Sequence, residues 1–433
     1  MKQADQEILF HAAQNTPGIY TLSITIPKEI VNTFFQFAAQ TQQELVAPAG
    51  FKAGSAPIEY IQTHYKKNIT HHLQEIALKH FVINTLLQKI RDEKIVLVSD
   101  PTLTKIFMTQ NQDAVYEFEG IAPHEVYIHS WKNLPFKATQ RKKYKDIDNQ
   151  VIAFLDAEAE LEKKYRPQDG VQVGDWVNFN AWITNKFDQP VFMNAKTNLW
   201  LKIGDEEPDV VLQEIFVGKK IGDLFITNNA NIQNYFCDLY DSPYKYAIEI
   251  TDILSGNHFS MNDFKHYFKL KSKKDVHNKL IEVFSFTSDI SQRRLIAHNA
   301  LHVIINKNQI RVPQQCIDSQ QARLLKELQQ KSDYNVYKMQ ENFNNQIAQM
   351  AKKQLNEMIA ADQIAFQENI SITHEDIRGF LHLQMRPRTK DFIYFAHPSS
   401  KMDGQEMPVP TELLKKCALR EKALNHIIHH LSK

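Results

Sequence analysis

The segment APAGFKAGSAP (residues 47–57) interrupts a long run of helix-forming sequence near the N-terminus. It contains two prolines, two glycines and one charged residue, Lys52. Before it, KEIVNTFFQFAAQTQQEL (28–45) repeats apolar residues at helical spacing. After it, Pro57 can open a second helix whose apolar residues recur every three or four positions for about 35 residues, or about 50 Å. The segment is therefore the tip of a helical hairpin, and it serves either as a spacer or as a surface presented to a partner.

Strands are expected on both sides of this hairpin. IYTLSITIP (19–27) alternates apolar and polar side chains, which predicts a half-buried strand. DAVYEFEGIAPHEVYIHSW (113–131) predicts a pair of strands. The first unit of the chain is thus expected to run strand, helix, loop, helix, strands.

The pattern changes after a short basic run, QRKKYKD (140–146), and a predicted linking helix at 147–165. Alternation with period two then marks strands around one short helix at 209–218. These strands are VQVGDWVNFNAWIT (171–184), TNLWLKIG (197–204) and YKYAIEITDIL (244–254). The pattern indicates a small, separate β-rich domain.

From Ser260 onward the sequence is typical of helices. Pro313 marks one boundary between them, and no internal repeat of fixed period occurs. The predicted helices are MNDFKHYFKL (261–270), KKDVHNKLIEVFSF (273–286), SQRRLIAHNALHVIINK (291–307), PQQCIDSQQARLLKELQQK (313–331), NVYKMQENFNNQIAQMAKKQLNEMIAADQIAFQ (335–367), HEDIRGFLHLQM (374–385) and TELLKKCALREKALNHIIHHL (411–431).

Length and composition exclude several classes of protein. The chain has 433 residues, enough for about three domains, and 43% of them are hydrophobic. Lys and Arg number 51 against 50 Asp and Glu, so the net charge gives no reason to expect a general nucleic-acid binder. The cysteines Cys237, Cys316 and Cys417 are far apart, which fits a reducing compartment without a disulfide framework. Neither a signal peptide nor a membrane-spanning run is evident, so we expect a cytoplasmic protein.

Two stretches carry a resemblance to a known family. GFKAGSAPIEYIQTHYKK (50–67) resembles the hairpin signature of trigger factor, the ribosome-associated bacterial chaperone. INKNQIRVPQQCIDSQQARLL (305–325) resembles the helical body of that family, where an Ile-x-Val-Pro turn leads into a helix beginning Ile-Asp-Ser. The order of the predicted parts is similar to that of the family over nearly the whole chain.

This resemblance implies an α+β, elongated, multidomain molecule. An N-terminal α/β hairpin domain (1–131), similar to the family's ribosome-binding domain, would be followed by a linker helix (132–167). A β-rich domain (168–254) resembles peptidyl-prolyl isomerases of the FK506-binding-protein type. The C-terminal region (255–433) would be an all-helical body whose arms form a cradle for substrate.

The family's hairpin tip reads Gly-Phe-Arg-x-Gly-Lys-x-Pro, and the resemblance implies ribosome binding by the matching residues here. These residues are Gly50, Phe51, Lys52, Gly54 and Pro57. Ala53 and Ser55 replace polar or cationic residues of the family, so most of the charge is missing. A single Lys–phosphate contact gives a salt slope of only about −0.9, and we expect weak docking. The alternative is a loop without a partner, with Phe51 packed against the hairpin helices.

The isomerase-like pocket is expected to be degenerate. Such enzymes enclose the X-Pro amide between aromatic walls, which favours the less polar twisted state. Gly218, Gly222 and Phe225 match the family, whereas most ring positions of the pocket do not. The degenerate pocket positions are Asn180, Ala181, Leu212 and Tyr235, of which only Tyr235 keeps its ring. The alternative is a slot rebuilt from Trp182, Phe192, Trp200 and Phe216, although rings at alternating strand positions usually belong to a core.

The helical region offers candidate substrate contacts near helical spacing on a polar helix. They are Met339, Phe343, Ile347, Met350 and Met358. Flexible thioether side chains suit a surface that must accept many apolar partners. The alternative is that about half of them pack against a partner helix, since a helix needs a buried face. His426, His429 and His430 have no carboxylate or cysteine beside them in sequence, so we expect no metal site.

The sequence therefore favours an ATP-independent chaperone of the trigger factor type. It would hold nascent or unfolded polypeptides and dock weakly beside the ribosomal exit tunnel through residues 50–57. No Gly-rich nucleotide loop occurs, so no cofactor is expected. An active peptidyl-prolyl cis-trans isomerase and a ribosome-free holdase or assembly scaffold are the alternatives. Membrane and DNA are not expected as partners, and a homodimer is left open.

Overall fold

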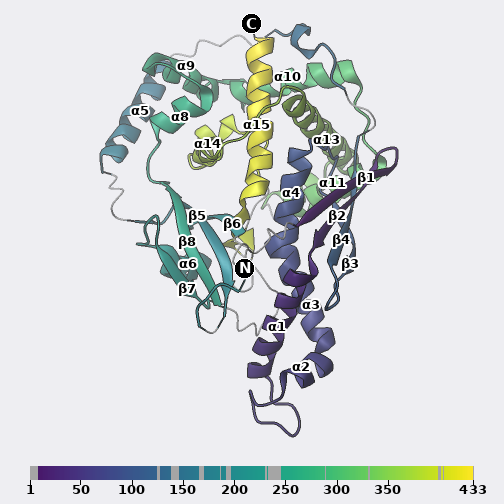
Figure 1. Cartoon of the computed structure of the whole chain (residues 1–433). Helices are drawn as coiled ribbons and strands as arrows, with labels where there is room; N and C mark the ends of the chain where they lie inside the picture. The colour runs from purple at the N-terminus through teal and green to yellow at the C-terminus, as the bar shows by residue number, and fades with distance from the viewer. Residues whose placement is uncertain are drawn as a thin grey trace.

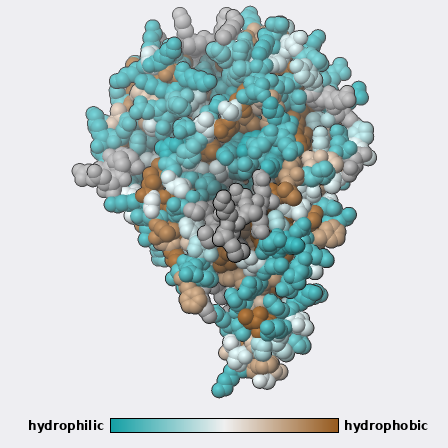
Figure 2. Space-filling model, in the orientation of Figure 1, coloured by the Kyte–Doolittle hydropathy of each residue, from teal (hydrophilic) through white to brown (hydrophobic). Residues whose placement is uncertain are grey.

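The computed structural model has an α+β fold that tapers to the tip of a helical hairpin (Figure 1, Figure 2). This agrees with the expected fold class. Among the described residues, no helix is both long and apolar enough to cross a membrane. The structure describes residues 8–123, 127–137, 146–164, 170–185, 187–191, 197–229, 232, 245–287, 289–329, 332–397, 401–402 and 404–432.

The N-terminal part is a four-stranded antiparallel sheet in the order β1-β2-β4-β3, covered by the hairpin helices. Leu22, Ile24 and Ile26 alternate along β2 and lie fully buried beneath α1, as the sequence predicts. The strands are β1 (Leu9–Thr16), β2 (Ile19–Ile26), β3 (Thr102–Phe107) and β4 (Ala114–Ile121).

The sheet differs from the sequence-based expectation in two ways: one predicted strand is missing and one observed strand was not predicted. Within the described residues 113–123 and 127–131 the structure has one strand, β4, which pairs with β2 and β3 instead of with the residues that follow it. The alternation pattern also does not predict β1, because Ala12, Ala13 and Gln14 leave its two faces poorly distinguished.

The second half of the hairpin is a nearly continuous helical rod from Ile58 to Asp92, as predicted. It bends at Tyr65, which has φ −105° and ψ 11°, and it contains one π-helical turn, η1 (Leu78–Val82). Its α-helical pieces, together with the preceding hairpin helix, are α1 (Lys28–Leu45), α2 (Ile58–His64), α3 (Lys66–Ala77) and α4 (Ile83–Asp92).

The middle of the chain forms an antiparallel sheet in the order β13-β6-β5-β8-β7, with α6 (Val210–Phe216) on one face. Helix α5 (Ile147–Lys164) precedes it and packs against the C-terminal helices. The strands of this part are β5 (Trp176–Thr184), β6 (Thr197–Lys202), β7 (Leu224–Thr227) and β8 (Lys245–Leu254), and a short 3-10 turn, η4 (Glu207–Asp209), leads into α6. The outermost strand, β13 (Val409–Pro410), comes from the C-terminal part and pairs with Trp200 and Leu199 of β6.

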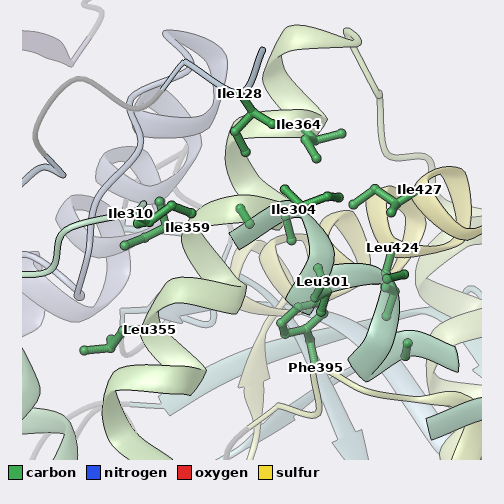
Figure 3. Close-up of a cluster of buried hydrophobic side chains, with 14 of the residues drawn as sticks. Ile128, Leu301, Ile304, Ile310, Leu355, Ile359, Ile364, Phe395, Leu424 and Ile427 are labelled. Atoms are coloured by element: carbon green, nitrogen blue, oxygen red, sulfur yellow. The ribbon is translucent and has the colours of Figure 1, made fainter. Parts of the chain in front are cut away.

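The C-terminal part is mainly helical and surrounds α15, the long helix at the centre of Figure 1. Figure 3 shows the core that α10, α13 and α15 share with Ile128 of the N-terminal part. The helices are α8 (Met261–Phe268), α9 (Lys273–Phe284), α10 (Gln292–Asn308), α11 (Gln314–Gln329), α12 (Tyr334–Lys338), α13 (Phe343–Gln367), α14 (His374–Gln384) and α15 (Thr411–Leu431). The remaining short elements are η2 (Trp131–Asn133), β9 (Phe286–Thr287), β10 (Ile290–Ser291), η5 (Thr389–Phe392), β11 (Lys401–Met402) and β12 (Gln405–Glu406).

Candidate functional site

The hairpin tip is shaped by its glycines. Gly50 and Gly54 have φ values of +89° and +75°, which strain any residue with a Cβ. Pro57 stands at the N-terminal boundary of α2. The tip is closed by a hydrogen bond from the Ser55 N–H to the Lys52 carbonyl, 3.0 Å long, and the Lys52 side chain is exposed.

Phe51 is half-buried instead of projecting freely. Its ring centroid lies 5.1 Å from that of Tyr60, and it packs at the edge of the hairpin core. The loop therefore presents Lys52, Gly54 and the backbone of 52–55 to solvent, with Phe51 at its base. Two exposed lysines at the end of the 50–67 stretch, Lys66 and Lys67, begin α3 on the same hairpin.

The degenerate pocket positions belong to different faces of the middle sheet. Ala181 and Leu212 are buried in the core between β5 and α6, whereas Asn180 lies in a polar row. The Asn198 Nδ2 group donates to Asn180 Oδ1 at 2.9 Å. Tyr235 lies outside the described residues.

The rings proposed for a rebuilt slot are also dispersed. Phe216 is fully buried against Phe179, at 5.2 Å between ring centroids, in the core that holds Leu212. Trp200 is fully buried in a different cluster, where it stacks on His374. Trp182 is also buried, and Phe192 lies outside the described residues. The described rings thus pack into the domain's cores and do not line one slot.

A cleft with a volume of about 750 Å³ lies between the N-terminal and C-terminal parts. Its walls come from residues 97–100, α11, α13, residues 394–397 and α15. Met350, Leu355, Met358, Phe395 and Leu413 give it apolar surface. Five segments that are far apart in sequence therefore build one partly apolar hollow.

Charged pairs line the same cleft. Lys416 on α15 binds Asp100 with an N–O distance of 2.7 Å, and this cation lowers the pKa of the Asp100 carboxyl. The Arg323 and Glu327 side chains approach to 3.7 Å along α11. Behind them, the buried Arg420 guanidinium donates to both carboxylate oxygens of Asp362, at 2.8 and 2.7 Å, and joins α15 to α13.

A second buried carboxylate fixes the back wall of the cleft. The N–H groups of Tyr394 and Phe395 both donate to Oε1 of Glu421 on α15. Glu421 is fully buried, and burial raises its pKa to about 7. The Tyr394 hydroxyl donates to Glu357 Oε1 of α13 at 2.8 Å. These bonds hold residues 394–395 between the two helices.

The five candidate substrate contacts lie in three different environments: the cleft, the helical core and the segment that follows α12. Met350 and Met358 line the cleft, and Met350 is 47% exposed. Ile347 is buried in the helical core and Phe343 packs at its edge, so these two serve the partner helices. Met339 is 86% exposed and follows α12, beside exposed Val336 and Tyr337. We call Val336, Tyr337 and Met339 the arm tip.

The C-terminal histidines pack against an aromatic side chain. The Trp131 ring centroid lies 5.7 Å from the rings of both His426 and His430, and His426 approaches Glu368 to 3.6 Å. Within the described part of the chain, no group of three or more His, Cys, Asp or Glu residues is placed to hold a metal ion.

Comparison with known proteins places the chain in a family. Residues 13–153 match the family model of the bacterial trigger factor protein (TF), and residues 285–390 match the model of its C-terminus; together these matches span more than half of the chain. The trigger factor of Geotalea uraniireducens is 20% identical over 370 residues, covering 82% of this chain and 83% of that protein. The trigger factor of Rickettsia massiliae is 20% identical over 437 residues, covering 97% of this chain and 91% of that protein.

A solved structure described as "Promiscuous Substrate Recognition in Folding and Assembly Activities of the Trigger Factor Chaperone" aligns with 98% of this chain and all of that chain, at 14% identity and a TM-score of 0.36. The assignment of the chain to a family rests on the sequence matches and not on this structural likeness. These matches define the chain as a protein-folding chaperone. Its structure combines a hairpin domain, a β-rich middle part and a helical part that carries the cleft. The chain belongs to the trigger factor family.

Proposed function

We propose that this chain is an ATP-independent cytoplasmic chaperone that holds unfolded or nascent polypeptide in the cleft between its N-terminal and C-terminal parts. The observation that carries this proposal is the cleft itself, with its volume of about 750 Å³ and its apolar surface from Met350, Met358, Leu355 and Phe395. A hollow of this size accepts a few side chains of an extended chain at a time.

The composition of the cleft favours promiscuous binding. Methionine side chains adapt to apolar groups of different shape. Exposed lysines and carboxylates around them keep the empty cleft hydrated. The arm tip, which carries exposed Val336, Tyr337 and Met339, supplies a second apolar patch. Two weak sites on one scaffold raise the overall affinity for a long flexible chain through effective concentration.

Aggregation of a chemically unfolded client, followed by light scattering, tests this proposal. Met350→Glu places a charge on the apolar surface of the cleft and is expected to weaken suppression of aggregation several-fold. Ile152→Glu is the matched control, because Ile152 on α5 is 48% exposed and lies outside the cleft. Met339→Glu reports on the arm tip, and we expect a smaller loss. Equal suppression by wild type, M350E and M339E would remove the cleft and the arm tip from the mechanism.

Ribosome docking through Gly50, Phe51, Lys52, Gly54 and Pro57 is the second part of the proposal. The exposed backbone of the tip and Lys52 support it, and Lys66 and Lys67 add positive charge on the same hairpin. With so few cations the interaction is weak and sensitive to salt. Phe51 acts from its place against Tyr60, where it sets the shape of the loop.

Cosedimentation with ribosomes at low and moderate salt tests the docking. We expect binding at low salt, its loss at moderate salt, and a further loss in Lys52→Gln. Lys338→Gln is the control, since Lys338 is an exposed lysine beside the arm tip. A protein that stays in the supernatant at low salt while still suppressing aggregation is a ribosome-free holdase.

A further inference from the structure

A basic segment at the junction of α8 and α9 has no part in the proposed function. Residues 265–274, KHYFKLKSKK, carry five lysines and one histidine and no acidic residue. Lys269, Lys271, Lys273 and Lys274 are all exposed, and Lys265 is half-exposed. We call these five lysines the basic ridge. It lies far from the hairpin tip, at the other end of the view in Figure 1.

The basic ridge borders a hollow with a volume of about 470 Å³. Lys265, His266 and Lys269 form one side of it, and Lys422 of α15 forms another. Among the described residues that line it, Asp376 is the one carboxylate. Lys422 already binds Asp376 at 2.6 Å, and Asp376 also takes part in the N-terminal cap of α14. The hollow therefore keeps an excess of positive charge.

The ridge lysines make few contacts with acids in the described part of the molecule, and Lys274 makes only a minor contribution to the lowered pKa of Asp275. Across the described ranges, none of the five forms a salt bridge. The nearby acids have other roles: Asp275 caps α9 through Ser272, Asp263 approaches Arg378 at 3.9 Å, and Glu375 faces solvent in the first turn of α14 near His266.

The position of two lysines works against helix stability. Lys273 and Lys274 are the first two residues of α9, where the helix dipole presents its positive end. Cations there are unfavourable, whereas Lys265 near the end of α8 has the favourable arrangement. Helix stability therefore does not account for Lys273 and Lys274 at this position, whereas an anion bound there would be attracted both by the lysines and by the positive end of the helix.

We propose that the basic ridge and its hollow bind the phosphate chain of a polyanion, either the backbone of single-stranded RNA or inorganic polyphosphate. Alternating lysines along 269–274 match repeated phosphates better than a single compact anion, and the hollow accepts one phosphate group beside Lys265, Lys269 and Lys422. This second surface is separate from the client cleft and from the hairpin tip.

Fluorescence anisotropy of labelled poly(U) and labelled polyphosphate, titrated with the full-length chain across a salt series, tests the proposal. Each Lys–phosphate contact adds about 0.7 to the salt slope for a single strand. Replacing Lys271, Lys273 and Lys274 together by Gln is therefore expected to make the slope shallower by about 2 and to weaken binding roughly 100-fold near 0.1 M salt. Replacing the same three by Arg should preserve binding.

The matched control replaces Lys307, Lys326 and Lys352 by Gln, because these lysines are also exposed, form no salt bridge within the described ranges and change the net charge equally. If only one of the two probes binds, and if its binding is lost in the ridge variant, that probe identifies the source of the phosphate chain. Equal weakening by ridge and control variants, no binding of either probe in 50 mM salt, or equal ridge-dependent binding of poly-glutamate would overturn the proposal.

Discussion

His80 lies where the hairpin domain meets the middle sheet, and burial fixes its protonation state. It is 5% exposed, its Nδ1 lies 3.1 Å from the Thr197 hydroxyl, and its ring stacks on Tyr246 with an interplanar angle of 8°. Burial, with a smaller contribution from Lys79, lowers its pKa from 6.5 to about 3. The folded protein therefore holds neutral His80 at pH values where the unfolded chain is protonated.

This difference predicts a loss of stability in acid. Because the folded pKa is depressed, the unfolded chain binds more protons below pH 6.5, and the free energy of unfolding falls as the pH drops toward 3. His80 alone is expected to account for about 2 kcal/mol of that loss at pH 5. Urea unfolding at pH 7.5 and pH 5 measures it.

His80→Asn is the comparison, since asparagine keeps a hydrogen-bonding group near Thr197 but does not titrate. The buried His382, whose pKa is also lowered to about 3, adds a similar slope to both proteins and cancels. If the free energy of unfolding of H80N falls between pH 7.5 and pH 5 by as much as that of the wild type, water reaches His80 in the folded wild-type protein.

At the scale of elements, the middle sheet depends on a strand from outside its own sequence. Val409 of β13 pairs with Trp200 of β6 and is 3% exposed, and the Glu406 N–H donates to Asp209 at 2.8 Å nearby. The Lys401 ammonium reaches Glu206 at 2.7 Å. The C-terminal part thus covers an edge of β6 that would otherwise offer free backbone groups to other chains.

Removing this cover is predicted to open β6 locally. Val409→Asp buries an unpaired carboxylate beside Trp200, and we expect it to lower the opening free energy of the β6 amides by more than about 2 kcal/mol. Hydrogen exchange measured by mass spectrometry reads this out. Val173→Asp is the control, because Val173 is 38% exposed in the same part of the chain. Unchanged exchange in β6 of V409D would show that β13 adds no protection.

The burial of Leu212 and Ala181 leads to a prediction about catalysis. Both side chains fill the core between α6 and β5, and the resemblance expects rings at these two positions. Among the described residues, neither position therefore supplies an aromatic wall that could enclose an X-Pro amide. We expect this chain, at catalytic amounts, to leave a proline-limited refolding step at its spontaneous rate. An active isomerase of the FK506-binding-protein type is the positive control. Clear acceleration would mean that the chain has a working prolyl slot and would overturn this prediction.

Elements with strong periodicity could be predicted from the sequence, and those set by distant partners could not. The rod from Ile58 to Asp92 and most helices after Ser260 follow from apolar spacing, because each buries one face. The single helix predicted at 335–367 is wrong, since the structure divides it into α12 and α13, and α12 has no buried residue. Strand β13 is two residues long and includes a proline, so nothing local distinguishes it from a loop. The cleft could not be predicted either, because five segments that are far apart in sequence form its walls. Among the candidate substrate contacts, only the burial seen in the structure distinguishes Met350, which lines the cleft, from Ile347, which lies in the helical core.

The whole molecule is more open than a globule of its mass. Its accessible surface is 23226 Å², against about 17,000 Å² expected for a compact protein of this size. The hairpin, which projects at the tapered end of the molecule (Figure 2), adds to this surface. Together with the cleft, it suits a protein that must expose apolar surface without a permanent partner. Among the described residues, three contact regions nevertheless tie the middle sheet to the rest. One is β13, the second is Ile76 and His80 of the hairpin, and the third is α14, whose His374 and Arg378 bind Asp252 of β8.

The three contact regions are predicted to be redundant. Ile76 is 2% exposed and packs in the core of the middle sheet, so Ile76→Asp disrupts the hairpin contact. Val409→Asp disrupts the β13 contact, and Asp252→Ala removes the ion pairs with α14. Because each part keeps its own hydrophobic core, each single variant should retain the wild-type radius of gyration in small-angle X-ray scattering, whereas the triple variant should open and show a larger radius.

Circular dichroism should show unchanged helix content in the triple variant. The variant Val173→Asp/Ile221→Asp is the control, since both residues are exposed on the middle domain. A wild-type radius already equal to that of the triple variant would mean that these contacts do not hold in solution.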